Sequence, residues 1–136
     1  MRFMLLVGVF LLVTGCATSP IPAERAKPAS KSRLLAFQQP PAEPYGTVWV
    51  TRDTGAAGSA CQVFVYIDGN HAASVWSGET AKFYLPIGER IIGINTSFYC
   101  GGGLKEHQQR IVQGKTHRLR ISMDTSFSME IAPTAY

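Results

Sequence analysis

The sequence is poor in charged residues and lacks the patterns that carry most enzyme chemistry. Asp, Glu, Lys and Arg make up 16% of the 136 residues, and there are only three histidines and three cysteines. No segment has the spacing of a zinc-binding HExxH or paired CxxC motif, of a nucleophile elbow, or of a phosphate-binding loop. The carboxylates are scattered, mostly at predicted turns, so no general acid and base can be paired. We therefore expect no catalytic residues, no metal site and no cofactor.

Long apolar runs are also scarce, and none reaches the roughly 20 residues that a membrane-spanning helix needs. The longest covers residues 3–13 and follows the positive charge of Arg2. A short apolar run after a positive charge is typical of a cleavable export signal. Residues 13–16, Val-Thr-Gly-Cys, come directly after this run.

These four residues resemble the lipobox of bacterial lipoproteins, in which an aliphatic residue, a small residue and Gly or Ala precede a Cys. The resemblance implies a signal peptide over residues 1–15, cleavage between Gly15 and Cys16, and acylation of Cys16. The lipid would hold the protein at a membrane. Ala17 resembles the residue that follows the Cys in lipoproteins of the outer membrane. For a Gram-negative source this implies the inner leaflet of the outer membrane, facing the periplasm. The alternative is an ordinary secretory signal that happens to contain a cysteine.

Residues 16–44 hold Cys16 and a stretch with six of the eight prolines in the chain. The stretch is poor in β-branched and aromatic residues, so it is not expected to bury enough surface to offset the entropy lost on ordering. We expect a disordered tether.

Much of the net charge of +4 lies in this segment, which argues against a nucleic-acid partner. We interpret its cations as ordinary linker charges, with contact to anionic lipid headgroups or peptidoglycan carboxylates as the alternative. They are Arg25, Lys27, Lys31 and Arg33.

Residues 45–136 show apolar residues with a period of two, interrupted by Gly and Pro, which indicates seven or eight short strands. The predicted strands cover residues 45–51, 61–67, 71–76, 80–85, 89–100, 104–112, 116–123 and about 127–131. The mostly polar segment 104–112 is predicted to be an edge strand. Asp68-Gly69 is a hairpin signal, because both positions of the turn must tolerate positive φ. The expected fold is an all-β, antiparallel β-sandwich of immunoglobulin-like, transthyretin-like or similar type, with a barrel as the alternative.

Two turn motifs resemble the PEGA-type hairpin unit, which pairs an I-D-G turn with an L-P-x-G turn. They are Ile67-Asp68-Gly69 and Leu85-Pro86-Ile87-Gly88, the second followed by Glu89-Arg90. The chain is also similar to a family of small Gram-negative lipoproteins of unknown function, which often add a turn like Gly114-Lys115-Thr116-His117. Residues 71–80 depart from the PEGA consensus. The resemblance implies a PEGA-like β-sandwich and no particular activity, because turn motifs specify a fold and not a reaction.

Two cysteines remain once Cys16 carries the lipid. Cys61 and Cys100 form an even pair in an oxidising compartment, which predicts a disulfide. It would close a loop of about 40 residues and stabilise the fold by roughly 4 kcal/mol in the chain-entropy model. The alternative is a catalytic thiol at Cys100, beside three glycines, which would need a base and an electropositive pocket.

Aromatic residues are dense in the predicted domain, and Trp76 stands at a predicted turn. Ordinary packing in a thin sandwich is the favoured interpretation of these residues, and the alternative is a binding surface for a protein or glycan at Trp76, Tyr84 and Tyr99. The favoured function is a non-catalytic, lipid-anchored envelope module with two partners, the membrane and an envelope protein. One alternative is an inhibitor of an envelope-directed hydrolase such as lysozyme. Another is a peptidoglycan-related enzyme that would use Cys100 or Asp68.

Overall fold

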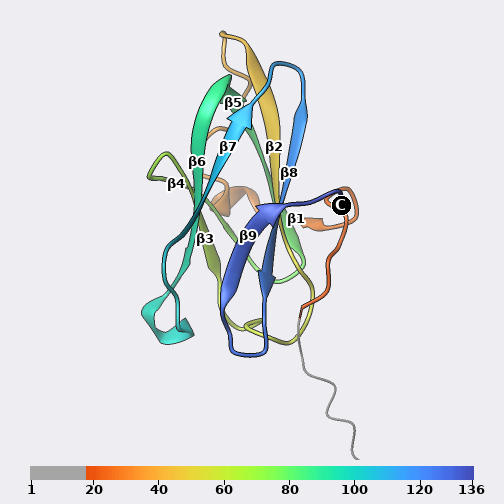
Figure 1. The fold of residues 1–136 in the computed structure, drawn as a ribbon, viewed down its shortest axis with the longest axis vertical. Helices are drawn as coiled ribbons and strands as arrows, with labels where there is room; N and C mark the ends of the chain where they lie inside the picture. Colours follow the sequence, from red (N-terminus) through yellow and green to blue (C-terminus); the bar gives the residue numbers. More distant parts are fainter. Residues whose placement is uncertain (1–17) are drawn as a thin grey trace, which may run out of the picture.

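The computed structural model describes residues 18–136, so the predicted signal peptide, Gly15 and Cys16 lie outside the described residues. The strands are β1 (Lys27–Pro28), β2 (Tyr45–Arg52), β3 (Val63–Ile67), β4 (Asn70–Val75), β5 (Glu79–Pro86), β6 (Gly88–Thr96), β7 (Lys105–Ile111), β8 (Thr116–Met123) and β9 (Met129–Pro133). Two 3-10 helices, η1 (Lys31–Arg33) and η2 (Phe98–Cys100), complete the fold. The strands make two sheets, in the orders β1-β5-β2-β8-β9 and β4-β3-β6-β7. The predicted all-β sandwich is confirmed (Figure 1).

The core lies between the two sheets and is built by the residues that alternate along each strand. Successive side chains of a strand point to opposite faces, so every second residue can be buried. Val48 and Val50 of β2 face Val63, Val65 and Ile67 of β3 across the sandwich, and all five are fully buried. The other large side chains that are fully buried are Val75, Phe83, Leu85, Ile92, Ile94, Leu119 and Ile121.

Two strand pairs are parallel, which corrects the antiparallel prediction for them. β2 runs parallel to β8, with Thr47 opposite Thr116, and β1 runs parallel to β5. The other neighbouring strands are antiparallel. A period of two identifies the buried face of a strand but is the same for both directions, so it could not reveal these pairs.

The predicted turn at Asp68-Gly69 has positive φ at both residues, 48° and 79°. The Asp68 carboxylate accepts the N–H of Ile91 and pairs with Arg90, so it stabilises the turn and the neighbouring strand. The strand predicted to reach Cys100 ends at Thr96 and gives way to η2. The predicted edge strand is β7, which pairs only with β6 among the described residues.

The prediction of a disordered tether was wrong for residues 18–38, which we call the N-terminal strap. Its backbone pairs with β5 at Lys27–Pro28, and the N–H of Tyr84 donates to the carbonyl of Phe37. Leu34 bridges to Ala73 of β4. The strap therefore covers the neighbouring edges of both sheets. Unpaired strand edges are otherwise free to pair with other chains, so the strap also protects the fold from edge-to-edge association.

The strap is ordered because the sandwich satisfies its backbone and buries its small side chains. Ala23, Ala26 and Ala29 are all buried, and alanine lets the strap backbone lie close to the strands. The prediction rested on composition and included only the surface that the segment buries by itself. It missed the hydrogen bonds that an open sheet edge offers to an extended, proline-containing chain.

The connections between strands gather at the two ends of the long axis (Figure 1). We call one the aromatic end, formed by residues 53–62, 97–104 and 124–128. The opposite one is the proline end, formed by residues 41–46, 86–88 and 112–115. Thr18, the first described residue, lies at the aromatic end, because its N–H donates to the carbonyl of Met123 at the end of β8.

Candidate functional site

Thr18 is fastened to the aromatic end by the carboxylate of Asp53, which follows β2. The Thr18 hydroxyl donates to Asp53 Oδ2 at 2.9 Å and accepts the N–H of Met123 at 2.9 Å. Arg120 of β8 donates two hydrogen bonds to the same carboxylate, at 2.7 and 2.6 Å. Asp53 is 1% exposed, and its hydrogen bond raises the pKa of Arg120. The start of the strap is therefore held rigidly against the ends of β2 and β8.

A second buried carboxylate, Glu79, holds the middle of the strap. Arg33 of η1 donates two hydrogen bonds to Glu79, at 2.6 and 2.9 Å, and the N–H of Trp76 donates a third at 2.9 Å. Burial alone would raise the pKa of Glu79, but the hydrogen bonds from Arg33 and Trp76 together lower it below the ordinary value. Glu79 is thus an ionised carboxylate with a structural task, joining η1 to the β4–β5 turn.

Arg52 is a buried cation that organises the long β2–β3 connection. Its guanidinium donates to the carbonyls of Gly58 (2.6 Å) and Cys61, and it forms no ion pair within residues 18–136. Burial lowers the pKa of Arg52, while the charge of Glu79 raises it. Because an arginine stays charged in proteins, these carbonyl contacts compensate for its burial and shape the loop around it.

Cys61 and Cys100 form a disulfide, with Cα atoms 6.0 Å apart, so the predicted pairing is confirmed. Both sulfurs are used in this bond, which removes the alternative of a free catalytic thiol at Cys100. The disulfide ties η2 to the β2–β3 connection that Arg52 organises. It therefore fixes the position of the two residues before Cys100 in η2, Phe98 and Tyr99.

The aromatic end carries large apolar side chains that extend into solvent. Phe98 is 92% exposed, Tyr99 94% and Phe127 58%. A groove of about 570 Å³ runs between η2 and the β8–β9 turn, lined by Tyr99, Phe127 and the disulfide. Soluble monomers rarely expose several such side chains together, and such patches mark surfaces that contact something else.

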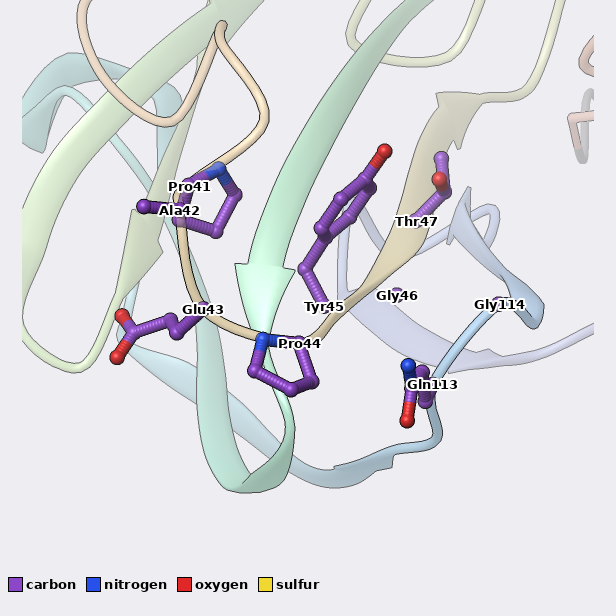
Figure 2. Close-up of a pocket in the computed structure, with 9 residues that line it drawn as sticks. All are labelled: Pro41, Ala42, Glu43, Pro44, Tyr45, Gly46, Thr47, Gln113 and Gly114. Carbon is purple, nitrogen blue, oxygen red and sulfur yellow. The ribbon is translucent and has the colours of Figure 1, made fainter.

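The proline end has a different chemistry. A groove of about 510 Å³ has Pro41–Pro44 on one side and Gln113–Gly114 on the other, with Tyr45–Thr47 between them (Figure 2). A smaller groove of about 310 Å³ shares Gln113 and is lined by Ile87 and Val112. Ile87 is 47% exposed. Prolines, backbone groups and scattered aliphatic side chains form a surface that suits an extended protein segment.

Tyr84 lies beside the proline groove on the outer face of its sheet. Its ring contacts that of Tyr45 edge to face, with centroids 5.9 Å apart. The Lys82 ammonium lies 5.1 Å from the Tyr84 centroid and 5.4 Å from that of Trp49, within the range of cation–π attraction. The four residues form one amphipathic stripe along β2 and β5.

The structure places Tyr84 and Tyr99 of the predicted binding surface at different ends of the fold. Tyr99 lies at the aromatic end. Trp76, which is 39% exposed, lies in the β4–β5 turn, whose Ser77 hydroxyl donates to the carbonyl of Asp53. Tyr84 lies towards the other end of β5, next to the proline groove. The sequence prediction missed Phe98 and Phe127. The available signal for Phe98 was its place beside the glycine-rich break, whereas Phe127 was predicted to begin the last strand.

Two of the three histidines, His71 and His117, have hydrogen-bond partners. His117 accepts the N–H of Val112 and contacts Gln109, and its pKa is lowered, first by burial and second by the charge of Lys115. His71 contacts the Ser74 hydroxyl. Over residues 18–136 no group of three or more His, Cys, Asp or Glu could hold a metal ion. In the same residues no helix is long and apolar enough to cross a membrane.

No protein-family model matches the chain, and no curated protein or solved structure is similar to it at a significant level.

Proposed function

We propose that the protein is a lipid-anchored, non-catalytic module of the bacterial envelope that binds a protein partner at its proline end. The anchor is the acyl group on Cys16 that the lipobox resemblance implies. A Gram-negative source would place the protein at the outer membrane, facing the periplasm. The observation that carries the proposal concerns Thr18, which is two residues after Cys16 in the sequence. Thr18 is attached to the sandwich by hydrogen bonds to Asp53 and Met123. An anchor at Cys16 would thus hold the proline end away from the membrane.

Export is supported by the disulfide between Cys61 and Cys100. Disulfides of this kind persist in oxidising compartments such as the periplasm and are rare in the bacterial cytosol. A covalent link also suits a small domain, because its single core supplies only a modest stability.

The partner surface is supported by what the strap leaves open. The strap covers the edges of β4 and β5, whereas β7 and β9, which lie close to each other, each pair with a single strand in the described residues. β7 begins near the aromatic end and reaches the smaller proline-end groove at Arg110 and Ile111. An extended segment of a partner could add to the β7 edge and place a side chain in that groove, as in β-strand addition.

Two measurements in cells test the proposal. A chain whose residues 1–16 are replaced by an ordinary cleavable export signal should be found in the soluble envelope fraction, and recovery of that chain in the membrane fraction at the level of the parent would overturn the anchoring. A photo-crosslinking amino acid at Gln113, which lines both grooves, should capture one dominant envelope protein. The same probe at the exposed Leu35 of the strap is the control. Equal capture at both positions, or none at Gln113, would overturn the partner surface.

A further inference from the structure

The aromatic residues of the aromatic end extend from two separate connections and converge on one surface. Phe98 and Tyr99 belong to η2, and their rings lie edge to face with centroids 5.8 Å apart. Phe127 lies in the β8–β9 turn, across the groove that Tyr99 also lines. The two most exposed apolar side chains of the described chain are thus adjacent to a third. Single exposed apolar residues are normal, but three gathered on one end indicate a contact surface.

The fold fixes the backbone that carries these side chains. The disulfide fixes η2, which ends at Gly101 in a left-handed conformation. Phe127 has a φ of 63°, a region that bulky residues rarely occupy. The turn is maintained by Asp124, whose carboxylate accepts the N–H groups of Ser126 and Ser128. A glycine would relieve this backbone strain, so a phenylalanine at this position has a conformational cost, as is common for residues at functional surfaces.

The start of the described chain lies at the same end as these rings. Thr18 bonds to Asp53 and Met123, and two residues of chain span at most about 7 Å. The chain therefore leaves the described fold towards Cys16 from the aromatic end. Asp53 is buried and paired with Arg120, so it adds no exposed charge to this end. The exposed charges beside Phe127 are Asp124, whose carboxylate accepts the N–H groups of its own turn, and Lys105, whose cation suits anionic headgroups.

We propose that the aromatic end docks on the membrane that carries the Cys16 acyl chains, with Phe98, Tyr99 and Phe127 in the layer between headgroups and acyl chains. This inference rests on the proposed acylation of Cys16. Aromatic rings favour this layer, and an acyl anchor gains strength from a second membrane contact. The docked sandwich stands with its long axis perpendicular to the membrane surface, so the proline end faces the periplasm. The lipid then orients the domain as well as retaining it.

The test places a photo-crosslinking amino acid at Phe98 or Tyr99 of the full-length precursor in living cells. Both side chains are more than nine-tenths exposed, so the probe leaves the core intact. The matched control places it at Ile87, which is also exposed but lies at the proline end. After irradiation, intact-mass measurement of the purified protein separates phospholipid adducts from protein adducts. We expect phospholipid adducts at positions 98 and 99 in severalfold excess over position 87.

Other outcomes overturn the inference and are distinguishable from failure of the proposed function. Protein adducts in place of lipid adducts would mean that a partner or a second copy covers the aromatic end. No adduct would mean that the rings face water. The same mass spectra report whether Cys16 is acylated. An acylated protein without lipid adducts at 98 and 99 overturns the docking alone, whereas an unacylated Cys16 overturns the anchor and the docking together.

Discussion

Replacing Glu79 with Gln should weaken the attachment of the strap to the sandwich. The substitution keeps the shape of the side chain but removes the charge that Arg33 and the N–H of Trp76 bind. Removing one partner of a fully buried ion pair costs about 3–5 kcal/mol. Here the Arg33 side chain is 22% exposed and recovers some hydration, so we expect a loss of about 2–3 kcal/mol. In a domain of this size the midpoint of thermal unfolding should fall by roughly 10 °C.

The assay is urea unfolding of the mature chain with Cys16→Ser, followed by tryptophan fluorescence. Glu24→Gln is the matched control, because Glu24 also joins the strap to an arginine, Arg118, but its side chain is 54% exposed. Exposed ion pairs contribute little, so the control should unfold like the parent chain. Equal losses for the two variants, or none for Glu79→Gln, would refute the importance of the buried attachment.

The same variant has a defined pH dependence. The pKa of Glu79 is lowered in the folded state from its ordinary value of 4.5, so its contribution to stability is complete above that value. It is lost as the pH falls through the lower folded-state pKa. The difference in unfolding free energy between the parent and Glu79→Gln should therefore shrink on acidification below about pH 4.5. A difference that stays constant down to strongly acidic pH would contradict the assignment of an ionised Glu79.

Three further changes test other parts of the fold. Replacing both Cys61 and Cys100 with Ser should lower the unfolding free energy by up to about 4 kcal/mol, and adding reductant should change the parent chain but not the variant. Gly46→Ala should cost about 1–3 kcal/mol, because a Cβ there would lie 2.6 Å from a backbone oxygen of the β7–β8 connection. Gly103→Ala, which meets nothing within 4 Å, should unfold like the parent chain. The pKa of His117 is lowered in the folded state, so its neutral form supports stability fully above its ordinary value of 6.5 and progressively less as the pH falls below it. His117→Gln should flatten the measured stability across that range, and an unchanged pH profile would refute the assignment.

The strand segments could be predicted from the sequence because each strand carries its own period of two. The Asp68-Gly69 turn was also local information, since both residues tolerate positive φ. Whether two neighbouring strands pair in parallel or antiparallel could not be predicted from the residues of either strand. Nothing in residues 45–52 indicates that β2 has β8 as a parallel neighbour, because that choice depends on how the whole sheet is assembled.

The strap could not be predicted from composition for a similar reason. Its order depends on Glu79 and Asp53, which are distant in sequence from Arg33 and Thr18. A carboxylate looks the same in the sequence whether it lies in a turn or is buried with an arginine. The disulfide was predictable because only two cysteines remained after Cys16. The gathering of Phe98, Tyr99 and Phe127 depended on η2, which the alternating pattern had extended as a strand.

The most direct test of the proposed anchor is the mass of the N-terminal peptide of the protein isolated from the membrane fraction. We predict a chain that begins at Cys16 and carries a diacylglyceryl group on sulfur and an acyl chain on nitrogen. A chain that retains Met1, or one that is cleaved elsewhere and leaves Cys16 unmodified, would contradict the anchor and the orientation that follows from it.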